Sequence, residues 1–277
     1  MALNIDKKNA GLILWVAMEA FYDVLFEVSN EDRHKILLQL ADEPMNVTRI
    51  SKRLGFSLTE TSRHLSRIGE VGLTRKDSDG LYHINNFGTV LLAQLKGVEF
   101  ITTYRDYFTS HSLTGIPEGL LARIGELSDS YLVDNVMASF HKVERLIEKA
   151  EEYILEISDR FIMSTFTLLR DAYKREVKLR NIQKMEFLRE PMYSEIDPEV
   201  VEEIKRFSPR LWEERYLDNL PFFLYMSEKE IAVIGFPTNS GKLDYFGFSS
   251  DDKKVHKWCH DLFQHFWELA EKNRLRE

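Results

Sequence analysis

Hydrophobic positions in the first part of the chain recur at helical spacing, between residues that typically begin or end helices. Residues 10–28 are the most apolar stretch, but acidic side chains recur there every four positions. This predicts an amphipathic helix that packs or dimerises, and it argues against a membrane span. A second helix is predicted to begin at an N-cap on Ser29 and to end before Pro44.

Two short helices with a tight turn between them are predicted next. Asn46 is expected to cap the first helix, and Gly55 is expected to end it in the left-handed conformation. Ser57 and Glu60 have the spacing of a capping box, which begins the second helix. Two helices joined by so short a turn, residues 55–57, must cross steeply, as in a helix-turn-helix.

The second of these helices has two chemically different sides. The side expected to be buried holds Leu58, Thr61, Leu65 and Ile68. The opposite side and its edges hold Thr59, Ser62, Arg63, His64, Ser66, Arg67 and Glu70. Short hydroxyls near a helix start suit phosphate and base-edge contacts, and Arg suits bidentate contact with guanine.

A predicted β-hairpin over residues 73–84, with a turn rich in Asp, Ser and Gly, follows this helix pair. Asn86 is then expected to cap a helix over residues 87–95. Helix-turn-helix plus hairpin indicates a winged helix that binds double-stranded DNA, and a protein-binding winged helix is the alternative. The candidate DNA contacts are Thr48, Arg49, Ser57, Thr59, Ser62, Arg63, His64, Arg67, Arg75, Lys76 and His83.

Helical and strand-like patterns alternate in the second half of the chain, which indicates a mixed α/β layer. Strands are expected at 154–158 and 176–182 and in a three-stranded meander over 221–248. Helices are expected at 138–153 and 165–175, after Asp197-Pro198, and from about 252 to 272. The last helix is predicted to bury Val255, Trp258, Leu262, Phe266 and Leu269.

The expected fold class is therefore α+β with several domains. It places the amphipathic helix at 1–28, the winged helix-turn-helix at 29–97, a connector containing one short helix at 98–130, and an α/β effector or dimerisation domain at 131–277.

Charge is unevenly distributed along the chain. The formal net charge is −8, yet residues 29–97 hold ten Lys and Arg against eight Asp and Glu. A phosphate responds to the local field at physiological salt, so the acidic total does not exclude DNA binding. Cys259 is the single cysteine, so an internal disulfide is excluded. This fits a reducing compartment, and we expect a cytoplasmic protein with no membrane role.

Sequences that could indicate catalysis or cofactors have better structural explanations. "GFPTNSGKL" has five residues between its glycines and lacks Ser or Thr after the Lys, so a hairpin turn is favoured over a phosphate-binding loop. His256, Cys259 and His260 have helical metal-ligand spacing, but a semi-buried helix face is the favoured interpretation. We expect no catalytic residues, no resident metal and no cofactor. An enzyme with an accessory winged helix remains an alternative.

Some arginines and aromatics of the second half could line a ligand pocket, although a core or surface role is favoured for each. They are Phe161, Arg170, Arg180, Arg215, Tyr216 and Tyr225. Arg180 stands between Leu179 and Asn181 near a predicted sheet end, and an arginine there could anchor an anion.

Residues 20–275 resemble the archaeal methanogenesis-regulatory-protein family of transcription regulators. The more specific segments are "DYFTSHSLTGIPEGLLARIGEL" and "KVERLIEKAEEYILEISDRF", which are similar to that family's linker and middle domain. The resemblance implies a winged helix joined to an effector-like α/β domain, with Arg63 and Arg67 in the recognition helix and Arg75 and Lys76 in the wing.

From the resemblance and the residues together we expect a homodimer that places two recognition helices in successive major grooves. Its C-terminal domain would sense a small-molecule or protein effector. The alternative is a constitutive DNA-binding protein whose C-terminal domain only dimerises or supports the fold.

Overall fold

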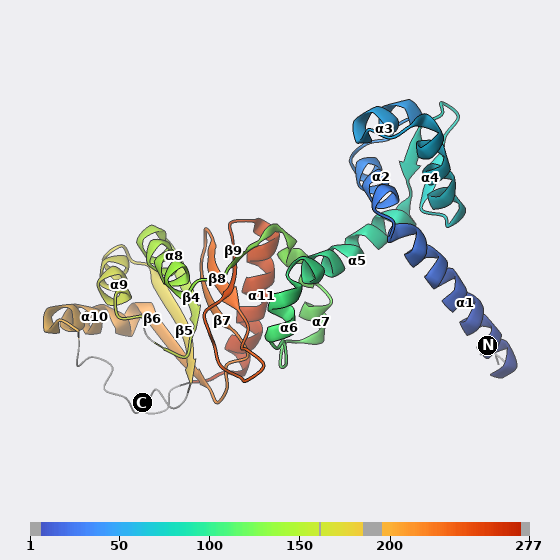
Figure 1. The fold of residues 1–277 in the computed structure, drawn as a ribbon. Helices are drawn as coiled ribbons and strands as arrows, with labels where there is room; N and C mark the ends of the chain where they lie inside the picture. The colour runs from blue at the N-terminus through green and yellow to red at the C-terminus, as the bar shows by residue number, and fades with distance from the viewer. Residues whose placement is uncertain (1–6, 161, 185–195, 273–277) are drawn as a thin grey trace. The chain divides into compact units, whose positions relative to one another are not determined.

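The computed structural model describes residues 7–160, 162–184 and 196–272, and the chain divides into two compact units (Figure 1). The first unit extends to Leu95 and the second begins at Lys96. The predicted α+β, multidomain fold class is confirmed, because a helical N-terminal unit precedes a unit built on a mixed sheet. None of the described helices is long and apolar enough to span a membrane.

The first unit is a winged helix. Its helices are α1 (Lys7–Val28), α2 (Glu31–Asp42), α3 (Val47–Leu54), α4 (Leu58–Glu70) and the beginning of α5 (Asn86–Thr103). The wing is the antiparallel pair β1 (Thr74–Lys76) and β2 (Tyr82–Ile84). Fully buried apolar side chains from α2, α3, α4 and the start of the wing form its core, among them Ile36, Leu37, Ile50, Leu65, Ile68 and Leu73.

The caps that delimit the helix-turn-helix follow from local sequence. The Asn46 side chain accepts from the backbone N–H of Arg49 at 2.9 Å, and Gly55 ends α3 with a φ of 74°. Ser57 Oγ accepts from the N–H of Glu60 at 3.2 Å at the start of α4. The predicted helix pair and its turn are therefore confirmed, because short-range hydrogen bonds determine both ends.

The structure places two helix N-caps one residue away from their predicted positions. Asn30, not Ser29, accepts from the backbone of Arg33 at 3.1 Å, and Asn85, not Asn86, accepts from Gly88 at 2.9 Å. In both places two adjacent residues could cap, and the backbone direction selects between them. At the start of α4, Leu58 is exposed rather than buried.

The second unit begins with helices where the sequence predicted mainly a connector. After the end of α5 come α6 (Arg105–Ser110), α7 (Glu118–Leu121) and a 3-10 helix (Ile124–Asp129). Buried Phe100, Tyr107 and Leu127 anchor this segment to the core of the second unit. Its helices carry part of the hydrophobic core and are therefore more than a linker.

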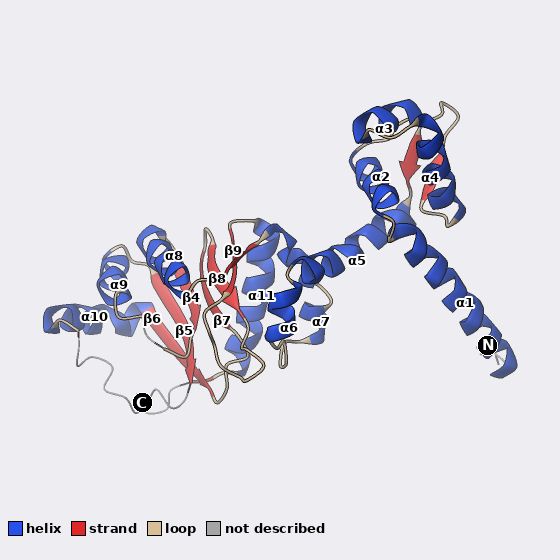
Figure 2. Cartoon of the chain, viewed as in Figure 1, coloured by secondary structure: helices blue, strands red, loops and turns tan. Residues whose placement is uncertain are grey.

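An eight-stranded mixed sheet lies at the centre of the second unit (Figure 2). Its order is β10-β6-β5-β4-β7-β8-β9-β3, with β4, β5 and β6 parallel and the other neighbours antiparallel. The strands are β3 (Tyr131–Val133), β4 (Tyr153–Ile157), β5 (Lys178–Lys184), β6 (Trp212–Leu217), β7 (Phe223–Ser227), β8 (Ile231–Gly235), β9 (Gly247–Ser250) and β10 (Glu271–Lys272). The predicted meander is confirmed as β7-β8-β9, whereas β3, β6 and β10 were not predicted, and β10 lies where the last helix was expected to continue.

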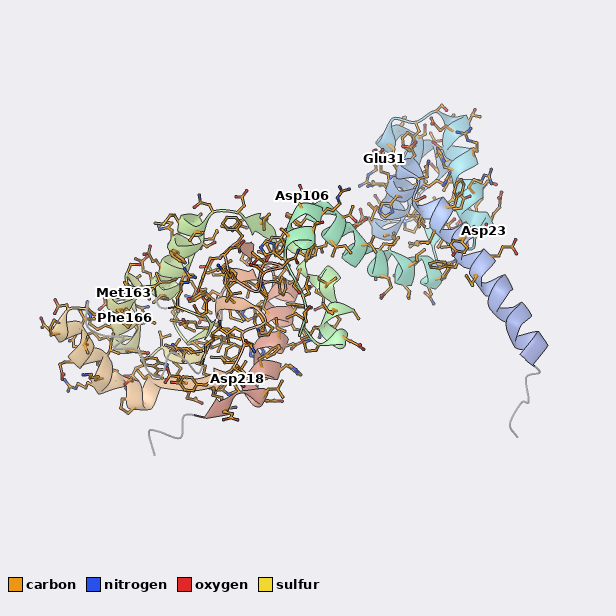
Figure 3. All side chains as sticks on the ribbon, turned by 60° about the horizontal axis from the view of Figure 1, so that its bottom comes forward. Asp23, Glu31, Asp106, Met163, Phe166 and Asp218 are labelled. Carbon is orange, nitrogen blue, oxygen red and sulfur yellow. The ribbon has the colours of Figure 1, made fainter. Side chains whose placement is uncertain are left out.

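Helices cover this sheet. They are α8 (Val136–Lys149), α9 (Thr165–Lys174), α10 (Pro198–Leu211) and α11 (Lys253–Leu269). Alternate residues of β4 lie on opposite faces. Leu155 lines a groove together with Phe263 of α11, and Glu156 lines a cavity together with Phe166 of α9, which Figure 3 labels. In α11, four of the five residues predicted as buried are buried, but Leu269 in its last turn is 60 % exposed.

Candidate nucleic-acid interface

Helix α4 presents a polar surface on the side away from the core of the first unit. Thr61, Leu65 and Ile68 are buried, as predicted. The exposed side chains are Thr59, Ser62, Arg63, Ser66, Arg67 and Glu70. Ser66 donates a hydrogen bond to the Glu70 carboxylate at 2.9 Å. The acidic group at the end of α4 is therefore hydrogen-bonded to a residue of the same exposed surface.

The two arginines of this surface differ in their electrostatic surroundings. Among the described residues, no carboxylate lies within ion-pair distance of Arg63. Arg67 Nη1 is 4.0 Å from Glu27 Oε1 of α1, but the Arg67 side chain remains 57 % exposed. Glu27 itself is buried and lies 2.8 Å from Arg33 Nε. Both guanidinium groups can therefore reach an external partner.

Helix α3 contributes a second basic edge to the first unit. Thr48 and Arg49 are exposed, as expected of candidate contacts. Arg49 Nη2 lies 2.6 Å and Arg53 Nη1 2.8 Å from the same oxygen of Glu43. The hydrogen bond from Arg53 and the charge of Arg49 lower the pKa of Glu43. Because Glu43 offsets part of their charge, these arginines are weaker candidates than Arg63. Arg53 is a basic neighbour that the sequence interpretation did not include.

The wing places its basic residues on exposed strand positions. Arg75 pairs with His83 across the hairpin, and within the described chain Arg75 has no carboxylate partner. Lys76 Nζ lies 5.4 Å from the centre of the Tyr82 ring. His83 Nε2 lies 2.6 Å from Asp77 Oδ2, and this hydrogen bond lowers the pKa of Asp77. Arg75 and Lys76 are thus accessible, whereas His83 supports the turn of the wing.

His64 does not lie where the sequence placed it. It was expected at the edge of the exposed surface of α4, but it is only 5 % exposed. The helix turns its ring inward, 6.2 Å from the ring of Phe56, because the turn before α4 brings that residue beneath it. His64 is therefore not a surface contact.

The speculative ligand residues of the second unit do not form one site. Arg180 and Arg215 both lie over the ring of Trp267, at 5.5 and 4.4 Å from its centre. Arg170 is instead on α9, 2.8 Å from Asp171. Tyr216 and Tyr225 are buried in the core, and Phe161 lies outside the described residues.

Arg180 borders a groove of about 260 Å³ between β4, β5 and α11. Its lining combines cationic, polar and apolar side chains, namely Tyr153, Leu155, Lys178, Arg180, His260, Phe263 and Gln264. Burial lowers the pKa of His260, and the neighbouring His256 acts in the same direction. Arg180 is also 3.3 Å from Glu213, so its charge is partly offset.

His256, Cys259 and His260 do not converge. Cys259 is fully buried, and His256 Nε2 is hydrogen-bonded to the carbonyl oxygen of Ser227 at 2.8 Å. In the part of the chain that the structure describes, these three residues do not form a group with metal-ligand spacing.

Comparison with known proteins identifies the class of the first unit. Residues 30–76 match the family model of the bacterial regulatory protein, arsR family. The chain therefore carries a regulatory helix-turn-helix domain, and this match supports a DNA-binding transcription regulator. No curated protein matches the chain.

Several solved structures align loosely with the chain. TrmBL2, an archaeal chromatin protein whose structure "shows a novel mode of DNA binding", is 16 % identical, with 88 % of this chain and 94 % of that chain covered and a TM-score of 0.41. Nuc, a phospholipase D family member from Salmonella typhimurium, is 12 % identical, with 52 % and 96 % covered and a TM-score of 0.34. The methyltransferase CalO1 is 16 % identical, with 79 % and 70 % covered and a TM-score of 0.27.

Proposed function

We propose that this protein is a homodimeric, cytoplasmic transcription regulator of the archaeal type that its sequence resembles, and that α4 reads DNA. The observation that carries this proposal is the exposed Arg63 on α4, in a domain that matches a regulatory helix-turn-helix family. Arg67 and the wing residues Arg75 and Lys76 extend the cationic surface. Arg63 and Arg67 would contact base edges, and Arg75 and Lys76 would contact phosphates.

The supporting polar contacts in this proposal come from the exposed hydroxyls. Thr59 and Ser62 lie beside Arg63 on α4, Ser57 lies at its N-terminus, and Thr48 lies on α3. Backbone N–H groups and hydroxyls at helix starts suit phosphate oxygens. Arg49 would add a weaker contact because Glu43 already binds it.

Selection of duplexes from a random pool by the full chain, followed by fluorescence anisotropy, tests this proposal and requires no known operator sequence. We expect Arg63→Ala/Arg67→Ala to weaken binding to the selected duplex at least about 10-fold, because each bidentate arginine contributes roughly 1–3 kcal/mol. Arg145→Ala, an exposed arginine of α8, is the matched control and should bind as the wild type does.

The wing provides a second comparison in the same experiment. Arg75→Ala/Lys76→Ala should weaken binding to all duplexes alike and reduce its salt dependence. A protein that makes fewer phosphate contacts releases fewer counterions when it binds. Selection of no preferred duplex, together with unchanged binding by both double variants, would contradict the proposal and favour the protein-binding winged helix.

We further propose that the groove beside Arg180 receives a small anionic effector. Its support is that two cations, Lys178 and Arg180, line the groove together with the polar ring of His260 and the apolar side chains of Leu155 and Phe263. A compact anion fits this lining, because Lys178 and Arg180 would bind its charge while the apolar side chains limit the access of water. Control of DNA binding by such an effector requires that it bind two states of the protein unequally.

A further inference from the structure

A buried histidine lies between two carboxylates on the inner side of the recognition helix. His64 Nε2 is 3.9 Å from Asp32 Oδ2, on the first turn of α2, and 4.0 Å from Glu60 Oε1, one turn earlier on α4. The three potential ligand atoms lie within 4.8 Å of one another. Among the described residues, no other group of His, Cys, Asp and Glu has this spacing.

Neither ring nitrogen of His64 has a hydrogen-bond partner among the residues that the structure describes, although the side chain is about nineteen-twentieths buried. A buried polar group without a partner is unfavourable, because it has lost its hydrogen bonds to water. The two carboxylates are 35 % and 39 % exposed, so their side chains can rotate toward the ring while an entry path remains open. Lys35 is engaged by Glu31 at 2.6 Å, which leaves the Asp32 carboxylate available.

We propose that Asp32, Glu60 and His64 bind one divalent first-row transition-metal ion, with water completing its coordination. One imidazole nitrogen and two carboxylate oxygens suit Zn²⁺, Mn²⁺, Fe²⁺ or Co²⁺, whereas Ca²⁺ and Mg²⁺ prefer oxygen ligands alone. Metal–ligand bonds of about 2.1 Å require the oxygens to move roughly 1 Å closer to Nε2, within the reach of a χ rotation.

Metal binding at this place would act directly on DNA recognition. Glu60 is next to Thr59 in the sequence and three residues before Arg63, so its charge opposes phosphate binding at the exposed surface of α4. The ion would neutralise two negative charges and join α4 to α2. The metal is therefore expected to raise DNA affinity. This effect rests on the proposed function, whereas the existence of the metal site is independent of that function.

Equilibrium dialysis of the full-length, chelator-treated protein against Zn²⁺, Mn²⁺ or Co²⁺ alone tests the site. All proteins would carry His256→Gln/His260→Gln, so that α11 contributes no ligand. One equivalent should bind, and Asp32→Asn or Glu60→Gln should weaken it at least about ten-fold, since even loss of a supporting partner costs 10- to 100-fold. These conservative changes at half-exposed positions keep the side-chain shape and leave His64 in place.

Matched controls come from the same two helices. Asp42→Asn on α2 and Glu70→Gln on α4 remove exposed acids outside the cluster, and they should bind the metal as the parent does. Absence of binding for all three ions, or equal binding by the parent and both cluster variants, would overturn the proposed site.

DNA anisotropy with and without the metal tests the coupling. The parent should bind its selected duplex more tightly with metal, whereas metal-free Glu60→Gln should already bind more tightly than the metal-free parent and should respond little to metal. Metal binding at the cluster with no change in DNA affinity would refute the coupling. If the parent protein binds metal at the cluster but binds no DNA, the proposed function is refuted and the proposed metal site is retained.

Discussion

The surroundings of single residues decide which charged side chains of this protein are available to an external ligand and which are paired within the fold. Glu27 is buried against Arg33, whereas Arg63 lies exposed without an acidic partner among the described residues. Isolated exposed charges interact freely with a ligand, but a buried pair is committed to the fold. The net charge of −8 therefore says little about the surface that we expect to meet DNA.

Glu156 is a residue whose ionisation should be visible in stability. Burial raises its pKa to about 7, and the charge of Glu214 acts in the same direction, against an opposing hydrogen bond from Tyr225. The folded state thus favours the protonated acid, while the unfolded chain titrates near the ordinary value of 4.5. The contribution of Glu156 to the free energy of unfolding is therefore largest below about pH 4.5. It falls as the pH rises to about 7 and is constant at higher pH.

We expect Glu156→Gln to remove this decline. The free energy of unfolding, measured by urea at pH 5 and pH 8, should fall less with pH in the variant than in the wild type. Glu148→Gln, an exposed acid of α8, should retain the wild-type difference. An equal decline in Glu156→Gln would show that the carboxyl is already ionised in the folded protein at pH 5.

At the scale of elements, α1 has an apolar side that the first unit does not cover. Leu25 and Val28 near its end pack into the core, but the large side chains of Met18, Phe21 and Tyr22 are exposed. Their spacing of three and four residues forms one stripe along the helix. This stripe supports the proposed dimer, because a second copy would bury it.

Substitution on this stripe is a better test than removal of residues 1–28, which would also delete buried Val28. We expect Met18→Asp/Phe21→Asp to convert the dimer into a monomer, measured as solution mass by light scattering, because charge in an apolar interface is strongly unfavourable. Met137→Asp on α8 replaces an exposed apolar side chain outside this stripe and should leave the mass unchanged. A dimeric double variant would exclude α1 as the interface.

At the scale of the whole molecule, the chain carries a second unit built on a mixed sheet in addition to its winged helix. The groove between β4, β5 and α11 is where we propose that an effector binds. A ligand that binds the folded protein raises its melting temperature in proportion to the logarithm of its concentration over Kd. If it also controls DNA binding, the two affinities must change together.

We expect at least one small anion, among phosphate, citrate and acetate, to raise the melting temperature of the full chain. Arg180→Ala should abolish the shift, and Arg145→Ala should preserve it. The same anion should change the affinity for the selected duplex in wild type only. If no anion shifts the melting temperature or the DNA affinity, the constitutive DNA-binding alternative is favoured.

The sequence by itself determined the helix-turn-helix and the wing, because their signals are local. Asn46, Gly55 and Ser57 form hydrogen bonds or backbone conformations within a few residues of their own positions. The exposed side of α4 followed from helical period alone. The strands β4, β5 and β7 were likewise predicted from short apolar patterns bounded by turns.

Only the tertiary structure decided the relations between distant segments. It turned His64 inward onto Asp32, separated Arg170 from Arg180, and placed β6 between β5 and β10. Such contacts depend on how whole elements pack. The strand β6 in particular contains three consecutive charged residues, Glu213, Glu214 and Arg215, which hide its strand pattern. The helical period predicts on which side of α4 a residue lies. Whether a residue at the edge of that side, such as His64, is buried depends on how α2 and Phe56 pack against the helix.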